Sequence, residues 1–124
     1  MEFKRGDTTT HYFKLPIASY VAGSFLFFAA KPLVDNDTAD TAAVINKKFT
    51  DSSVSLVSNP GYATYTLTFV PADIIGVTFS NGESMKEYLG EFQFIAPAAN
   101  PISFPANNKY IDVKIYADIR LAIT

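Results

Sequence analysis

The chain has 124 residues, of which 48% are hydrophobic and 15% aromatic, and its formal net charge is −2. This composition excludes a disordered chain, and the small negative charge provides no basic field for nucleic-acid binding. The sequence has no cysteine, which excludes a disulfide framework and any zinc site built on cysteine. A chain of this length is typical of one domain, so we expect residues 1–124 to form a single unit. Because the net charge is slightly negative, we expect no nucleic-acid partner.

The N-terminal stretch does not have the pattern of a signal peptide, because Glu2, Lys4 and Arg5 follow Met1 and no long apolar run comes next. The most apolar run, residues 21–30, is about half the length that a membrane-spanning helix needs. We therefore expect synthesis in the cytoplasm and no membrane insertion. The run is better interpreted as a strand buried on both faces.

Residues 3–10, FKRGDTTT, allow two interpretations. Arg5-Gly6-Asp7 spells the tripeptide that integrins bind, which would indicate an adhesion protein. Alternatively, Gly6 can adopt φ angles that other residues avoid, and Asp7 and Thr8 can hydrogen-bond to the backbone that follows them. The second interpretation predicts a turn or bulge between two pieces of strand and needs no partner.

Apolar and polar residues alternate along the next candidate strand, residues 11–17, where Pro16 indicates an edge position because it has no N–H to donate. Residues 23–31 are apolar on both parities, which predicts a central strand. Shorter strands are expected at residues 42–48 and 53–58, and a strict alternation predicts a half-buried strand at residues 63–69.

Residues 70–76 predict a short helical turn that starts at Pro71. Residues 87–96 place Tyr88, Phe92 and Phe94 on one face, with Gly90 as a bulge or a point of close approach. From Ile111 to Ile123 every odd position is apolar, which predicts either one long strand or two strands bent at residues 117–118.

Turn sequences separate these runs at short intervals: DNDTAD, SNPG, SNG, APAANP and PANN. Many short strands with such spacing are typical of an antiparallel sandwich or barrel. We expect an all-β, single-domain antiparallel β-sandwich of the Ig-like type, with about 7–9 short strands.

The order of these blocks resembles a family of small bacteriophage and prophage tail proteins, including the N-terminal domains of baseplate upper proteins. The similar stretches are the N-terminal KRGDT, GSFLFFAAK, NPGYATYTLTFVPAD, YLGEFQF and the closing YIDVKIYADIRLAIT. Two segments, DNDTADTAAVINKK and the proline-rich APAANPISFPANNK, differ from the family pattern and leave the tail component open.

The resemblance implies a β-sandwich domain in the tail of a virion, synthesised in the cytoplasm of the bacterial host. It implies a structural role without catalysis or cofactors, and assembly with copies of itself and other tail or baseplate proteins in a ring or trimer. The N-terminal and C-terminal strands are the candidate interface. A head–tail joining protein of the same virion is one alternative, and a carbohydrate-binding module that recognises a host-surface glycan is another.

Catalytic and metal-binding candidates are few. His11 is the single histidine and is expected to be a boundary side chain rather than a general base, since no nucleophile motif accompanies it. Asp35, Asp37 and Asp40 could offer oxygen ligands to calcium, but the positions that an EF-hand loop needs as Gly and Glu hold Asp40 and Asn46. A solvated polar loop is the expected alternative.

Carboxylate pairs of the kind that glycosidases use could come from Glu83, Glu87 and Glu91, but a polar turn and an outward strand face are the expected explanation of these residues. No catalytic, cofactor or metal residue is therefore assigned.

The tyrosines Tyr20, Tyr62, Tyr88, Tyr110 and Tyr116 could lie near the surface, where the apolar ring and polar tip of tyrosine suit protein interfaces and sugar-binding platforms. For any one of these tyrosines, a core or boundary position is the expected alternative. The interface residues that we predict are Arg5, Asp7, Tyr88, Tyr110 and Tyr116.

Overall fold

The computed structural model describes residues 1–32, 43–98, 101–104 and 110–117. These residues form nine strands in two sheets and no α-helix, which confirms the all-β prediction. The strands are β1 (Glu2–Lys4), β2 (Thr9–Pro16), β3 (Phe25–Pro32), β4 (Ile45–Phe49), β5 (Val54–Val57), β6 (Tyr62–Phe69), β7 (Met85–Ile95), β8 (Ile102–Phe104) and β9 (Ile111–Tyr116). Three short 3₁₀ turns are η1 (Ile17–Ser19), η3 (Asp51–Ser53) and η4 (Pro71–Asp73).

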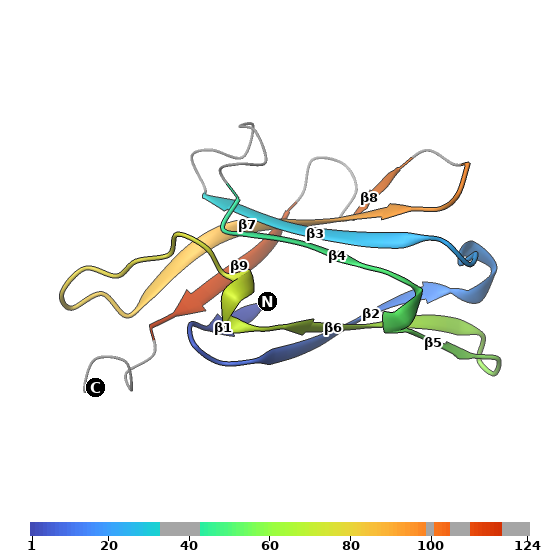
Figure 1. Cartoon of the computed structure of the whole chain (residues 1–124), viewed down its shortest axis with the longest axis horizontal. Helices are drawn as coiled ribbons and strands as arrows, with labels where there is room; N and C mark the ends of the chain where they lie inside the picture. Colours follow the sequence, from blue (N-terminus) through green and yellow to red (C-terminus); the bar gives the residue numbers. More distant parts are fainter. Residues whose placement is uncertain (33–42, 99–100, 105–109, 118–124) are drawn as a thin grey trace.

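The two sheets lie face to face as the layers of a sandwich (Figure 1). The six-stranded sheet has the order β1-β9-β7-β3-β4, and β8 pairs with β7 beside β9. The three-stranded sheet has the order β2-β6-β5. As predicted, β3 is a central strand and β2, which ends at Pro16, is an edge strand. The Ig-like type of the sandwich stays a prediction.

The pairing of β1 with β9 is parallel, whereas every other described pair is antiparallel. Phe3 lies opposite Ile115 in this parallel pair. The β1–β9 pair is thus the described exception to the predicted antiparallel arrangement. The physical reason is that β1 and β2 belong to different sheets, so the turn between them crosses the sandwich and does not close a hairpin.

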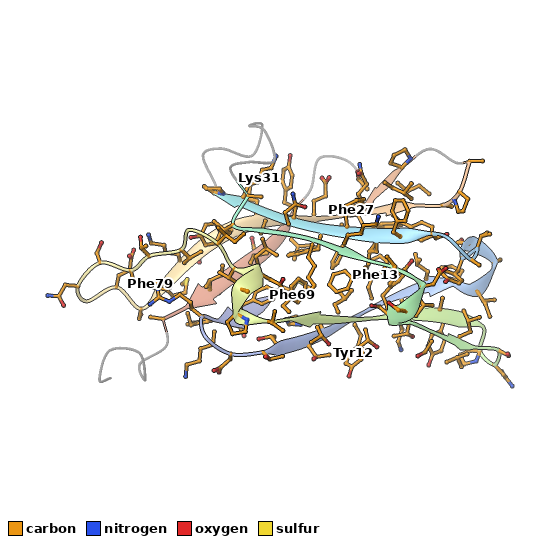
Figure 2. The ribbon with its side chains drawn as sticks, in the orientation of Figure 1. Tyr12, Phe13, Phe27, Lys31, Phe69 and Phe79 are labelled. Atoms are coloured by element: carbon orange, nitrogen blue, oxygen red, sulfur yellow. The ribbon has the colours of Figure 1, made fainter. Side chains whose placement is uncertain are left out.

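The core lies between the layers and follows the alternation of the sequence. In β6 the side chains of Ala63, Tyr65, Leu67 and Phe69 are buried, and the threonines between them face outward. Figure 2 shows Phe13 and Phe69 pointing between the sheets and Tyr12 pointing away from them. Aromatic rings pack in the centre, with Phe28 and Phe92 centroids 4.8 Å apart and Phe3 edge-on to Phe69 at 5.0 Å.

Gly90 is a point of close approach, as predicted, between β7 and its neighbours on both sides. A Cβ atom at this position would lie 2.7 Å from Val113 Cγ2 and 3.0 Å from Phe28 Cζ. The glycine therefore lets β3 and β9 place large side chains beside β7 without a clash.

Lys47 connects β4 of one sheet with the end of β6 in the other. Its Nζ donates to the backbone oxygen of Thr68 at 2.8 Å and to Asp73 Oδ2 at 2.6 Å, while its stem passes the rings of Phe49 and Phe69. Asp73 ends the predicted turn that starts at Pro71, and its Oδ2 also accepts the backbone N–H of Val70 at 2.8 Å. The salt bridge thus fixes η4 against the edge strand β4.

Two features of the chain differ from the sequence expectations. Residues 102–104 form β8, although their proline-rich surroundings were predicted as turn. Tyr88 is 6% exposed and packs in the core, which is one of the two positions expected for it, so its assignment as an interface residue is wrong. Tyr88 has the same parity as Phe92 and Phe94, and that parity faces inward. Predictions on residues 35–40 and 118–124 lie outside the described residues.

Candidate functional site

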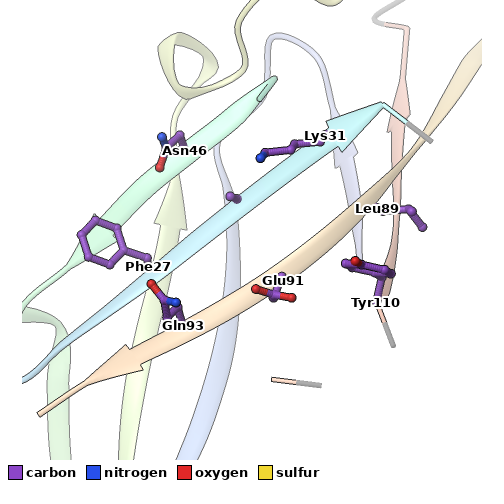
Figure 3. A pocket seen from close by; sticks show the side chains of 8 residues that line it. Phe27, Lys31, Asn46, Leu89, Glu91, Gln93 and Tyr110 are labelled. Carbon is purple, nitrogen blue, oxygen red and sulfur yellow. The ribbon is translucent and has the colours of Figure 1, made fainter. Parts of the chain in front are cut away.

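A hollow of about 500 Å³ opens on the outer face of the six-stranded sheet (Figure 3). It is lined by side chains from the outward positions of three neighbouring strands and by a residue that precedes β9: Phe27, Ala29, Lys31, Asn46, Leu89, Glu91, Gln93 and Tyr110. Its volume falls within the range of about 300–1,000 Å³ typical of small-molecule sites.

The hollow exists because a small residue stands among larger ones. Ala29 on β3 lies opposite Asn46 of β4 on one side and opposite Glu91 of β7 on the other. Phe27 and Lys31 stand two residues away on the same face of β3. A methyl group surrounded by four longer side chains leaves a depression over Ala29.

Three polar side chains of the lining, those of Asn46, Glu91 and Gln93, are the ones that matter for binding. Within the described parts of the chain, no side-chain hydrogen bond involves Asn46, Glu91 or Gln93. Tyr110, which is 37% exposed, closes one end of the hollow together with Leu89. Sequence reasoning missed this site, although Tyr110 and Glu91 had each been singled out, because its shape depends on the pairing of β4, β3 and β7.

The Arg5-Gly6-Asp7 stretch forms the turn that takes the chain from one sheet to the other. Gly6 has φ 99°, and the backbone N–H of Asp7 donates to Lys4 O at 3.0 Å. Arg5 Nη1 donates to Val77 O at 3.0 Å, and its guanidinium lies 4.9 Å from the ring centroid of Phe79. These internal contacts support the turn interpretation of the stretch.

The predicted interface residues are not brought together in one patch. Arg5 and Asp7 lie half-buried at the turn, Tyr88 is in the core, and Tyr110 lines the hollow. Tyr116 is half-buried beside β1, where its hydroxyl donates to Glu2 Oε1 at 2.8 Å. This hydrogen bond raises the pKa of Tyr116, and burial adds to the effect.

A polar cluster connects the loop after η1 with η3. The hydroxyl of Tyr20 donates to Asp51 Oδ1, and the backbone N–H of Gly23 donates to Asp51 Oδ2 at 2.8 Å. The Tyr20 bond lowers the pKa of Asp51, and the Gly23 bond lowers it further. Burial and the bond to Asp51 raise the pKa of Tyr20 to about 12.

Tyr65 lies next to this cluster, with its ring centroid 6.3 Å from that of Tyr20. Its side chain is fully buried, and its hydroxyl has no hydrogen-bond partner among the described residues. Burial raises the pKa of Tyr65 to about 12, and the negative charge of Asp51 adds to the shift.

His11 has the boundary position that was predicted for it. Its Nε2 lies 3.2 Å from Glu2 O, and its ring stands edge-on to Phe3 at 5.2 Å. The acids are dispersed: Glu83 accepts the backbone N–H of Ser80 at 3.0 Å, and Glu87 and Glu91 are four residues apart along β7, hence about 13 Å. A glycosidase pair needs about 5–9.5 Å.

In the residues that the structure describes, no group of three or more His, Cys, Asp or Glu side chains could hold a metal ion. Asp35, Asp37 and Asp40 lie outside these residues. The described part of the chain also contains no helix long and apolar enough to cross a membrane.

The outer face of the three-stranded sheet is a second surface with a distinct character. Tyr12 is 67% exposed in the middle of the edge strand β2, opposite Thr66 of the central strand β6. The surrounding outward residues of β2 and β6 are Thr10, Lys14, Pro16, Tyr62, Thr64 and Thr68. Lys14 is the one charged residue among them, and its Nζ lies 4.7 Å from the ring centroid of Tyr62.

Comparison with protein-family models, with curated proteins and with solved structures found no match for this chain.

Proposed function

We propose that the chain is a non-enzymatic structural domain of a bacteriophage or prophage tail, which acts by assembly with its own copies and with other tail or baseplate proteins. The β-sandwich architecture and the resemblance of the N-terminal block to tail proteins support this proposal. Among the described residues, the features that a partner could use are exposed sheet faces and strand edges, not a cluster of catalytic groups.

The observation that carries the proposal is the exposure of Tyr12 on a nearly uncharged sheet face. Protein interfaces are enriched in tyrosine and have few charged residues at their centre. Tyr12 is 67% exposed and stands among threonines, with Lys14 as the nearest charge on β2. Few charges would have to be desolvated when another protein covers this face, and burying an unpaired charge is the largest solvation cost.

Strand edges support assembly as well. β2 pairs with β6 alone, and β5 likewise pairs only with β6, so the described three-stranded sheet has two open edges. An open edge presents unpaired backbone donors and acceptors to which another chain can add a strand. β2 is the longer of the two, with eight residues.

Sedimentation velocity over a range of protein concentrations tests the proposal, together with capture of the tail proteins encoded beside this one. We expect oligomers or a complex in the wild type, and weaker association in Tyr12→Ser, by about 2 kcal/mol if Tyr12 is central to the interface. Ile102→Ser is the control, because it removes an exposed apolar side chain from β8 of the other sheet. A protein that stays monomeric and captures no tail protein contradicts the proposal.

A further inference from the structure

We propose that the hollow over Ala29, on the outer face of the six-stranded sheet, binds a neutral saccharide unit. This ligand site is separate from the assembly face around Tyr12, because the two lie on outward faces of opposite sheets (Figure 2). The inference is therefore independent of the role in assembly.

The shape of the hollow suits one sugar ring. Asn46 and Glu91 flank Ala29 on the two neighbouring strands, so their backbones lie about 10 Å apart across β3. A pyranose ring placed over the methyl group of Ala29 would have hydroxyl groups directed toward both flanks. The floor is apolar and small, and the polar groups stand at the rim.

The chemistry of the rim points to hydroxyl groups as the partner. The amides of Asn46 and Gln93 each offer both donors and an acceptor, and the carboxylate of Glu91 accepts hydrogen bonds. Vicinal hydroxyls of a sugar both donate and accept, so they can satisfy groups of either kind. Because the described protein satisfies none of these three side chains, a ligand hydroxyl would not have to displace an internal bond.

Two aromatic side chains of the lining could cover the apolar face of a sugar ring. Phe27 stands beside Gln93 on the neighbouring strand, and Tyr110 lies at the opposite end of the hollow (Figure 3). An apolar ring can cover the C–H face of a pyranose, and the hydroxyl of Tyr110 adds a polar tip. Lys31 and Glu91 contribute opposite charges, which favours a neutral ligand over a phosphate or a carboxylate.

The hollow is open and makes few contacts, so a single sugar should bind with a Kd on the order of 1 mM. The probes are glucose, galactose and N-acetylglucosamine, each titrated into the ¹⁵N-labelled protein and followed by NMR. We expect at least one probe to shift the backbone amides of Ala29, Glu91 and Gln93. A second series with trisaccharides of the same sugars distinguishes a glycan chain, which should bind more tightly, from a free monosaccharide.

Ala29→Leu tests the site by filling its floor, and we expect saccharide binding to weaken at least ~10-fold. Ser55→Leu is the matched control, because it adds a similar side chain to an outward position of β5. Gln93→Ala keeps the test informative if the leucine disturbs folding, and it should weaken binding several-fold while the amide spectrum stays otherwise that of the wild type.

The absence of shifts with all probes and trisaccharides would overturn the proposal, as would binding that Ala29→Leu and Gln93→Ala both leave intact. Loss of self-association in Ala29→Leu, without saccharide binding in the wild type, would identify the hollow as a protein interface instead. Because Tyr12→Ser tests assembly on the other sheet, failure of one proposal can be told from failure of the other.

Discussion

Gly90 of β7 and Val113 of β9 are diagonal neighbours, so close that a Cβ atom on Gly90 would come within 2.7 Å of Val113 Cγ2. Phe28 approaches from the other side, 3.0 Å from the same point. All three positions are fully or almost fully buried, so no neighbour can move into solvent. The absence of a side chain at Gly90 is therefore what lets the central strands of the six-stranded sheet pack at this spacing.

Gly90→Ala is expected to destabilise the protein by about 1–3 kcal/mol, because overpacking of a filled core exceeds the gain of about 0.4–1 kcal/mol from a stiffer unfolded chain. Urea unfolding measures the change. The double variant Gly90→Ala, Val113→Ala should lose less than the sum of the two single variants, because the second substitution removes the contacting methyl. Strictly additive losses would show that the Gly90–Val113 contact does not limit the packing.

Arg5→Ala is expected to lower the free energy of unfolding by about 1 kcal/mol, because it removes the charge-assisted bond to Val77 O and the contact with Phe79. Amide hydrogen exchange should become faster in residues 74–79. Lys4→Ala is the control, since Lys4 is the exposed neighbour of Arg5 in the sequence. Equal effects of the two substitutions would mean that Arg5 does not stabilise the segment it contacts.

Tyr65→Phe is expected to leave stability unchanged or to raise it by up to ~1 kcal/mol, because the buried hydroxyl has no partner among the described residues. Tyr20→Phe, which removes the donor to Asp51, should lower stability instead. Thermal unfolding of both variants beside the wild type gives the comparison. A marked loss of stability in Tyr65→Phe would show that its hydroxyl is satisfied in solution.

Acid is expected to weaken the Tyr20–Asp51–Gly23 cluster. The pKa of Asp51 is lower in the folded protein than its ordinary value of 3.8, so its contribution to stability is complete above that value and is lost as the pH falls through the folded pKa. The stability difference between the wild type and Asp51→Asn should therefore shrink in urea titrations as the pH falls from 7 to below 3.8. A difference that is constant with pH would contradict the assignment.

The strand faces could be predicted from the sequence because side-chain direction is a local property. The alternation at residues 63–69 and 111–116 gave the buried faces of β6 and β9, and Gly90 was located by the aromatic residues around it. The polar tip of Tyr88 suggested an interface residue, although its parity with Phe92 and Phe94 indicates the core. The alternation along a strand thus predicted burial better than the polarity of a single side chain did.

Partners across the sheets could not be predicted, because they depend on contacts between distant segments. The parallel pairing of β1 with β9 and the short strand β8 leave no local signal in the sequence. The hollow has the same origin: Asn46, Ala29 and Glu91 form a row only once β4, β3 and β7 are in register. Neither a tyrosine nor a glutamate alone indicates such a site.

The union of β1 with β9 joins segments more than a hundred residues apart, with Glu2 opposite Lys114. During synthesis, β1 therefore cannot pair with β9 until nearly all of the described chain has emerged from the ribosome. Phe3 remains without its final neighbour Ile115 throughout that time. Closure of the sandwich is expected to be a late and slow event, because long-range pairing carries a large loop-closure entropy.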